Sequence, residues 1–136
     1  MAHYNPLPSI GDIVWCKFPE SEALGKPGPT PRPSLILNIM PDQHAVLVAF
    51  GTSQKIHRVF TGEFVIQDDL ATAGLSYPTK FDLNRLQILP FNTDWFDAAP
   101  VTPRNTPAPK LGVLPPVCMI PMREAWKALK AKKSAG

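Results

Sequence analysis

The sequence has few cysteines, and neither of them has a spacing typical of a metal site. Its two cysteines, Cys16 and Cys118, lie far apart and form no Cys-x-x-Cys motif. This pattern indicates neither a zinc site nor a framework of disulfide bonds. We therefore expect no metal and no other cofactor.

The sequence also lacks a recognisable targeting or membrane-spanning segment. Residues 1–9 contain neither the basic block nor the apolar block of a secretory signal peptide. No apolar run approaches the length that crosses a lipid bilayer, and no internal repeat is found. We expect a cytoplasmic protein without a membrane partner.

Most of the chain has no excess of positive charge. The formal net charge is +3, from 14 Lys and Arg residues against 11 Asp and Glu residues. Residues 123–133 hold five of the positive side chains and one of the negative ones, which leaves 9 positive and 10 negative elsewhere. The basic character therefore belongs to a C-terminal tail that is typical of a solvated helix end. It is weak evidence that the rest of the chain binds nucleic acid.

Proline, by contrast, is abundant. The 136 residues include 17 prolines, and 44% of the chain is hydrophobic. This length fits a single domain over residues 1–136, and the hydrophobic fraction indicates a globular chain. Because proline lacks the N–H group that helices and central strands need, its abundance favours a loop-rich β architecture.

Short apolar segments bounded by turn residues predict β-strands. The predicted strands cover residues 10–18, 34–39, 45–50, 60–66 and 79–90, the last interrupted by a turn at 82–85. The runs 34–39 and 45–50 are almost continuously apolar, which is typical of buried strands, and a hairpin connection joins them. Strands at roughly ten-residue spacing favour a barrel or a sandwich over a βαβ fold.

Two segments are too rich in proline and turn residues for regular structure. Residues 19–31 contain four prolines and two glycines, and they predict a surface loop. Residues 91–110 predict a proline-rich loop excursion, with Trp95 and Phe96 as its hydrophobic anchor.

A C-terminal element is expected over residues 111–133. From residue 122 to residue 133, Ala125, Trp126 and Leu129 recur at helical spacing with lysines between them. This pattern predicts an amphipathic helix that packs on a barrel formed by residues 9–90.

Four segments occur in an order that resembles a known family. They are residues 11–15 (Gly-Asp-Ile-Val-Trp), 32–37 (Arg-Pro-Ser-Leu-Ile-Leu), 52–54 (Thr-Ser-Gln) and 111–115 (Leu-Gly-Val-Leu-Pro) before the helix. Together they resemble the PemK/MazF-type growth-inhibitor toxins of bacterial toxin–antitoxin systems. The resemblance covers residues 9–90 and 111–131, and residues 91–110 have no counterpart.

The resemblance implies a mainly β fold, a small SH3-like barrel of the CcdB/PemK type with a C-terminal α-helix, assembled as a homodimer. It also implies a metal-independent endoribonuclease that cleaves single-stranded RNA through the ribose 2′-OH. In this family an antitoxin protein neutralises the enzyme by lying across the RNA groove.

The family's catalytic arginine falls on Arg32 and its catalytic threonine on Thr52. Some members carry an Arg-x-Asp pair, which matches Lys80-Phe81-Asp82 with lysine in place of arginine. Residues 19–31 contain no histidine, although a histidine in this loop assists in some members.

These residue types suit metal-free RNA cleavage. The planar guanidinium of Arg32 can hold two phosphate oxygens at once, and the prolines on either side of it stiffen the backbone. Thr52 can donate a hydrogen bond to the same phosphate, and Asp82 is the candidate base or sugar-binding acceptor. The candidate RNA-binding residues are Lys80, Ser53, Gln54, Lys55, His57 and Arg58. Of these, Lys55, His57 and Arg58 form either a basic strip along the RNA or only a polar strand edge.

Each candidate also has a simpler interpretation. Arg32 can be a solvated charge, Thr52 a turn residue, and Asp82 the cap of a turn. Trp15 is expected in the core or at a dimer interface rather than as a stacking platform for bases. The alternative function is a catalytically degenerate barrel that binds nucleic acid or a protein partner, and poisoning of gyrase is less favoured.

Overall fold

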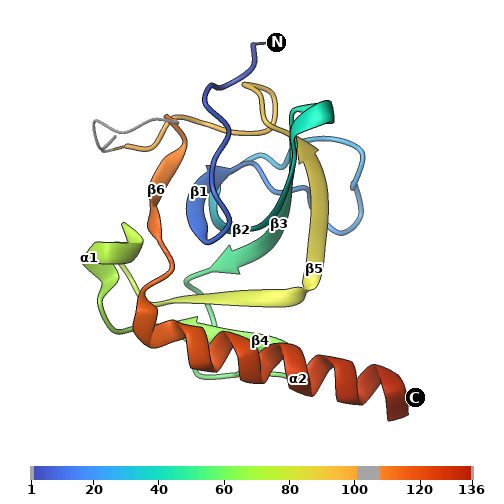
Figure 1. The fold of residues 1–136 in the computed structure, drawn as a ribbon, viewed down its shortest axis with the longest axis vertical. Helices are drawn as coiled ribbons and strands as arrows, with labels where there is room; N and C mark the ends of the chain where they lie inside the picture. Colours follow the sequence, from blue (N-terminus) through green and yellow to red (C-terminus); the bar gives the residue numbers. More distant parts are fainter. Residues whose placement is uncertain (1, 101–107, 136) are drawn as a thin grey trace.

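The chain forms one antiparallel sheet of six strands that curls into a half-barrel, with a helix at its C-terminal end (Figure 1). The computed structural model describes residues 2–100 and 108–135. Its strands are β1 (Asp12–Cys16), β2 (Arg32–Met40), β3 (Ala45–Thr52), β4 (Glu63–Ile66), β5 (Thr79–Pro90) and β6 (Lys110–Val113), and its α-helices are α1 (Leu70–Ala73) and α2 (Met119–Ala135). The strand order is β4-β5-β3-β2-β1-β6.

The first three predicted strands are confirmed, with boundaries that differ by a few residues. A short 3-10 helix, Pro41–Gln43, makes the hairpin connection between β2 and β3, and His44 follows it in the left-handed conformation. The fourth strand is shorter than predicted, because residues 60–62 form a turn in which the Glu63 amide donates to the Phe60 carbonyl at 3.0 Å. The single-turn helix α1 was not predicted.

The predicted turn at residues 82–85 is wrong, because β5 continues through it. On β3, Phe50 pairs with Asp82 whereas Ala49 pairs with Leu86. Residues 83–85 are therefore an enlarged bulge on the β5 side, and the strand bends there (Figure 1). We refer to this bulge as the β5 corner. The Leu83 amide donates to the Gly62 carbonyl at 2.9 Å, so the corner stays hydrogen-bonded.

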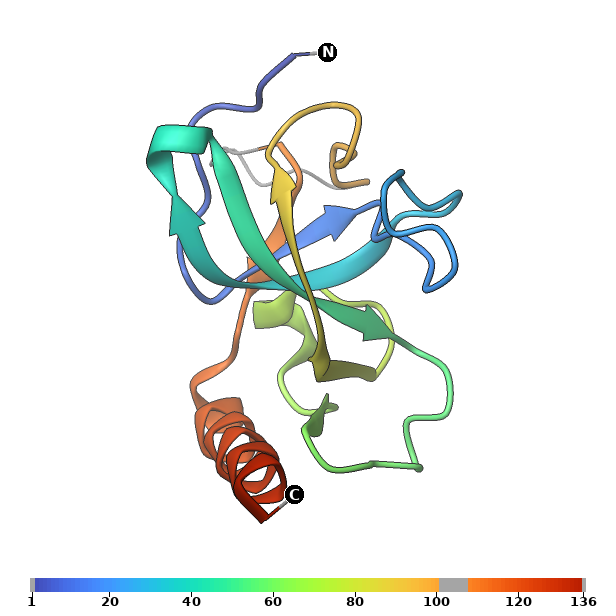
Figure 2. The same cartoon turned by 90° about the vertical axis from the view of Figure 1, so that its right-hand side faces the viewer.

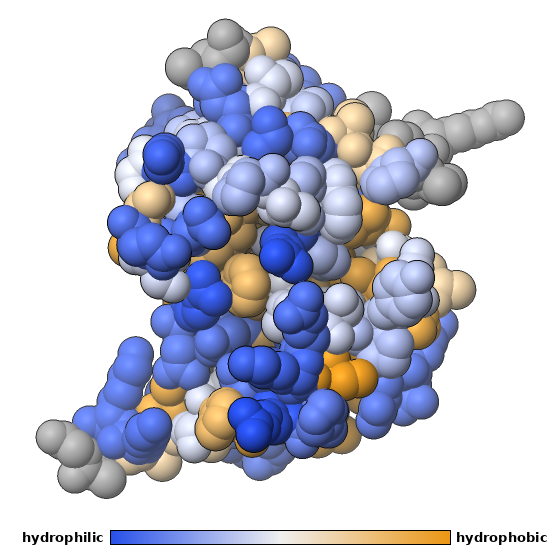
Figure 3. All heavy atoms as spheres, turned by 180° about the vertical axis from the view of Figure 1, so that it is seen from behind, coloured by the Kyte–Doolittle hydropathy of each residue, from blue (hydrophilic) through white to orange (hydrophobic). Residues whose placement is uncertain are grey.

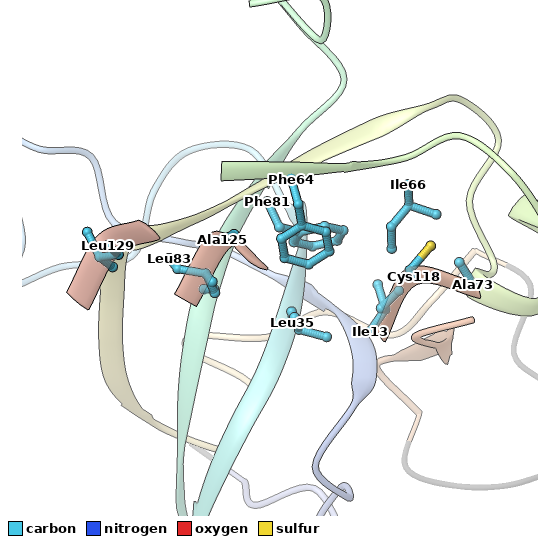
Figure 4. Close-up of a cluster of buried hydrophobic side chains, with 11 residues drawn as sticks. Ile13, Leu35, Phe64, Ile66, Ala73, Phe81, Leu83, Cys118, Ala125 and Leu129 are labelled. Carbon is cyan, nitrogen blue, oxygen red and sulfur yellow. The ribbon is translucent and has the colours of Figure 1, made fainter. Parts of the chain in front are cut away.

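Both faces of the sheet are buried, which explains the nearly continuous apolar runs of its central strands. On β1, Ile13 belongs to the first of two hydrophobic clusters and Val14 to the second. On β2, Leu35 belongs to the first cluster and Ile36 to the second. The first cluster lies between the sheet and the two α-helices (Figure 4). The second lies beneath the N-terminal segment and residues 91–96.

The predicted anchor of the proline-rich excursion is confirmed. Phe96 is fully buried in the second cluster and bridges to Cys16 in β1, and Trp95 packs against the same cluster. The Asn92 side chain organises this turn, because its Oδ1 accepts from the amides of Asp94 and Trp95 at 2.9 and 3.3 Å. The central part of the predicted excursion, residues 101–107, lies outside the described residues.

The predicted C-terminal helix is confirmed, and it begins earlier than expected because the 3-10 turn Pro116–Cys118 leads directly into it. Ala125 and Leu129 are buried in the first cluster, near Leu83 of β5 (Figure 4). The last turns of α2 project beyond the sheet and carry hydrophilic side chains (Figures 1 and 3). None of the described helices combines the length and the apolar character needed to cross a membrane.

Both cysteines are buried and free of disulfide bonds. Burial raises the pKa of the Cys16 thiol above its ordinary value. The pKa of Cys118 is also raised, first by burial and then by the negative charges of Asp68 and Asp69. Because the thiolate is the reactive form, neither side chain has the character of a nucleophile.

The packing of α2 on the sheet predicts a large loss of stability in the Leu129→Ala variant. The side chain is 2% exposed, and its removal leaves a cavity in the first cluster. We expect the free energy of unfolding to fall by about 3 kcal/mol, measured by urea denaturation. Lys130→Ala, one residue along on the exposed side, is the control and should change it little. Equal unfolding midpoints for the two variants would contradict this packing.

Candidate functional site

The three residues predicted as catalytic line one hollow, although they lie on three different strands. Arg32 begins β2, Thr52 ends β3, and Asp82 precedes the β5 corner. The hollow has a volume of about 380 Å³. Its full lining is Arg32, Phe50, Thr52, Gln54, Lys55, Glu63, Lys80, Asp82 and Arg85, and we name it the arginine hollow.

Cross-strand pairing explains why these side chains share a face. Phe50 of β3 pairs with Asp82 of β5, and Thr52 pairs with Lys80. Residues directly opposite in an antiparallel pair lie on the same face, and alternate residues of one strand do so as well. Ser34 of β2 pairs with Phe50, which places Arg32, two residues earlier, on this face too.

Arg32 lies where three hollows meet. It lines the arginine hollow, a hollow of about 250 Å³ beside the loop that holds Phe18 to Thr30, and a third of about 480 Å³. Its guanidinium makes no hydrogen bond or ion pair with any described residue. In Figure 2 that loop and the segment 53–62 leave the sheet on the same side. Within the described ranges, Arg32 is therefore a cation without a partner at the junction of three concave surfaces.

Close packing fixes the backbone beside Arg32. A Cβ atom on Gly51 would overlap the Pro33 carbonyl oxygen and lie 2.7 Å from a ring carbon of Phe81. Only glycine lets β2 and β3 approach this closely, so the residue before Thr52 is fixed by packing rather than by a need for flexibility.

Thr52 and Asp82 each keep part of their hydrogen-bonding capacity. The Thr52 hydroxyl oxygen accepts from the Gln54 amide at 3.1 Å, which leaves its proton available to a ligand. One oxygen of Asp82, Oδ1, accepts from the Asn84 amide at 2.8 Å and from Asn84 Nδ2 at 3.0 Å. The other oxygen has no partner among the described residues. Asp82 thus caps the β5 corner and still has a free acceptor.

Lys80 has a structural role in addition to lining the hollow. It is 7% exposed, and its Nζ lies 3.2 Å from Glu63 Oε1. The same ammonium donates to the carbonyls of Arg58 at 2.8 Å and Lys55 at 3.3 Å. All three of its donors are therefore used, and its charge is balanced by Glu63. Lys80 holds the segment 53–62 against the sheet.

The other predicted RNA-binding residues do not form one continuous strip. Gln54 and Lys55 line the arginine hollow, whereas Ser53 lines the hollow of about 480 Å³. His57 is exposed and lines a further hollow between residues 56–67 and α2. Arg58 is exposed, and its carbonyl is the one that Lys80 binds.

Arg85 is the residue of this site that sequence reasoning missed. Its guanidinium carbon lies 4.0 Å from the centre of the Phe50 ring and 5.7 Å from that of Phe18. At 4.0 Å the cation interacts favourably with the face of Phe50. Arg85 lines two of the hollows that Arg32 lines. It lies in the segment interpreted as a turn, where nothing local in the sequence distinguishes it from a solvated arginine.

The third hollow next to Arg32 has an aromatic wall. Its lining consists of Trp15, Pro31, Arg32, Pro33, Thr52, Ser53, Ala71, Gly74, Ser76, Tyr77, Thr79, Pro100 and Leu111, and we name it the tryptophan hollow. Trp15, expected in the core or at a dimer interface, is only partly buried here and contributes to this wall.

No described group of three His, Cys, Asp or Glu side chains lies close enough together to hold a metal ion. No protein-family model matches the chain, and no curated protein matches it either.

The ion pair beneath the arginine hollow predicts that Lys80→Met destabilises the protein. The variant leaves the Glu63 carboxylate almost buried without its cation, and we expect the free energy of unfolding to fall by about 3 to 5 kcal/mol. Amide hydrogen exchange of residues 55–60 should accelerate, because two of their carbonyls lose a donor.

The double variant Lys80→Met/Glu63→Gln is the control. It removes both charges and keeps an acceptor for the Phe60 amide, so it should recover much of the lost stability. If the single and double variants unfold alike, the charge pair is not what holds this segment.

Proposed function

We propose that this protein is a toxin-like endoribonuclease of the PemK/MazF type, with an SH3-like barrel of the CcdB class. It cleaves single-stranded RNA without a metal, acts in the cytoplasm as a homodimer, and is neutralised by an antitoxin protein. The observation that carries the proposal is the convergence of Arg32, Thr52 and Asp82, from three strands, on the arginine hollow. The motifs of residues 11–15 and 32–37 support the same assignment.

The central task of the reaction is to stabilise negative charge on the phosphorus as the 2′-oxygen attacks. Arg32 has no partner in the part of the chain that the structure describes, so its donors are open to phosphate oxygens. Arg85 supplies a second guanidinium at the same hollow, held over the Phe50 ring. Two guanidinium groups that line the same hollow could both bind one phosphate there, and they would favour the more highly charged transition state over the singly charged ground state.

Thr52 and Asp82 complete the site with one donor and one acceptor. The Thr52 hydroxyl keeps its proton and donates a hydrogen bond to a phosphate oxygen. The free oxygen of Asp82 accepts the proton of the 2′-OH or holds the ribose next to it. Lys80 is a positioning residue, because its ammonium is already bound to Glu63 and to two carbonyls. The leaving 5′-oxygen takes its proton from solvent.

This proposal predicts that Arg32→Ala abolishes most RNA cleavage. Loss of a guanidinium that stabilises the transition state should lower the rate by roughly a hundredfold or more. The assay incubates purified protein with an unstructured RNA and a structured one in the presence of EDTA, and wild type should cleave the unstructured RNA. Arg32→Lys should recover only part of the activity, because lysine lacks the planar fork. Arg123→Ala, on the exposed side of α2, is the matched control.

An absence of cleavage by the wild-type protein, or full cleavage by Arg32→Ala, would refute the nuclease. RNA binding without cleavage would instead support the catalytically degenerate barrel. The neutralised charge of Lys80, at the position where some family members carry arginine, is the observation that favours this second function.

A separate prediction concerns Arg85, the arginine that sequence reasoning missed. Arg85→Ala should lower the cleavage rate by about tenfold or more, while leaving the free energy of unfolding nearly unchanged because the side chain is partly exposed. Phe50→Leu removes the ring beneath the guanidinium, and it should also lower the cleavage rate, by a smaller factor than Arg85→Ala does. Unchanged cleavage rates in both variants would show that Arg85 does not contribute to catalysis.

A further inference from the structure

The tryptophan hollow opens directly beside the arginine hollow. The two share Arg32 and Thr52, whereas Asp82 lines only the arginine hollow and Trp15 lines only the tryptophan hollow. A phosphate bound by Arg32 and Thr52 would therefore lie on the boundary between them. One of its two nucleotides would extend into each hollow.

Hydrogen bonds hold the backbone at both aromatic residues of the tryptophan hollow, Trp15 and Tyr77. The Trp15 amide donates to the Pro109 carbonyl at 2.8 Å, and the Trp15 carbonyl accepts from the Asp97 amide at 3.1 Å. Elsewhere in the lining, the Thr79 hydroxyl donates to the Tyr77 carbonyl at 3.0 Å. The Tyr77 side chain is 70% exposed, so its ring is available to a ligand.

The chemistry of this hollow suits a flat, uncharged ring system. It combines two aromatic side chains with proline and leucine carbon, and its hydroxyl groups can bind polar ring edges. Among the described residues that line it, Arg32, at the shared boundary, is the one with a charged side chain. At about 480 Å³ the hollow is large enough to hold a nucleobase with its ribose. Aromatic rings beside a cation are a common way to bind single-stranded nucleic acid.

We infer that the tryptophan hollow is a nucleobase subsite, for the nucleotide on the 3′ side of the phosphate that Arg32 binds. This inference rests on the proposed function. The polarity follows from Asp82, because the 2′-OH that attacks belongs to the nucleotide on the 5′ side. That ribose must lie near Asp82, in the arginine hollow, so the 3′ nucleotide extends into the tryptophan hollow.

The test measures binding of small ligands and does not require cleavage. Isotope-labelled protein is titrated with adenosine 5′-monophosphate, adenosine 3′-monophosphate and ribose 5-phosphate, and the indole N–H resonance of Trp15, assigned with Trp15→Phe, is followed by NMR. We expect the 5′-monophosphate to shift this resonance and to bind about tenfold more tightly than ribose 5-phosphate, the factor expected from stacking of one base.

Variants separate the base from the phosphate. Tyr77→Ala should abolish the advantage of the 5′-monophosphate and leave ribose 5-phosphate binding unchanged, whereas Tyr77→Phe should keep the advantage. Arg32→Ala should weaken binding of both ligands. Ile120→Ala, at an exposed position on α2, is the surface control and should change neither.

Two outcomes overturn the inference. The subsite is refuted if the 5′-monophosphate binds no more tightly than ribose 5-phosphate, and the polarity is refuted if the 3′-monophosphate shifts Trp15 equally well. An RNA cleavage assay on the same preparation distinguishes failure of the subsite from failure of the proposed nuclease activity. If the protein cleaves RNA but fails the titration, only the subsite is refuted. If it binds the 5′-monophosphate as expected but does not cleave RNA, only the proposed nuclease activity is refuted.

Discussion

The β5 corner is the constraint on which the sheet and the candidate site both depend. The 12 residues of β5 remain paired with β3 on both sides of the three-residue bulge. Leu83, inside the bulge, is buried in the cluster beneath α2. Because a core side chain is fixed by its packing, the residues on either side of it are fixed as well. Asp82 and Arg85 are thereby brought to the same hollow. Hydrophobic burial on one face of the sheet thus determines the polar geometry on the other.

A second constraint is electrostatic. Segment 53–62 has no regular secondary structure, yet it forms one side of the arginine hollow through Gln54 and Lys55. It is held by the ammonium of Lys80, which is acceptable in a nearly dry position because Glu63 and two carbonyls satisfy it. This arrangement withdraws one cation from ligand binding. The positive character of the hollow then depends on Arg32, Arg85 and Lys55, and the planar groups of the two arginines suit a phosphate better than a point charge does.

Local patterns were enough to predict the central strands and the C-terminal helix, whereas Arg32 and Thr52 were singled out by the family resemblance. Strands buried on both faces appear as continuous apolar runs, and α2 repeats its apolar residues at helical spacing. The β5 corner could not be predicted in this way. Asp82 and Asn84 form the local hydrogen bonds of an ordinary turn, and only pairing with β3, distant in sequence, keeps the segment in the sheet. Arg85 was missed for the same reason, because its place beside Phe50 exists only once the bulge has formed.

Arg32 and Tyr77 differ in how a substitution would affect the two hollows. Arg32 borders both the arginine hollow and the tryptophan hollow, and close packing of β2 on Gly51 fixes the strand that carries it. A change there would alter phosphate binding and base binding together. Of the two hollows, Tyr77 lines only the tryptophan hollow, and its side chain is 70% exposed in the connection between α1 and β5. If the tryptophan hollow binds a base as inferred, substitutions at Tyr77 should change which base is accepted and leave the phosphate contacts of Arg32 intact, because Tyr77 is exposed whereas the strand of Arg32 is closely packed.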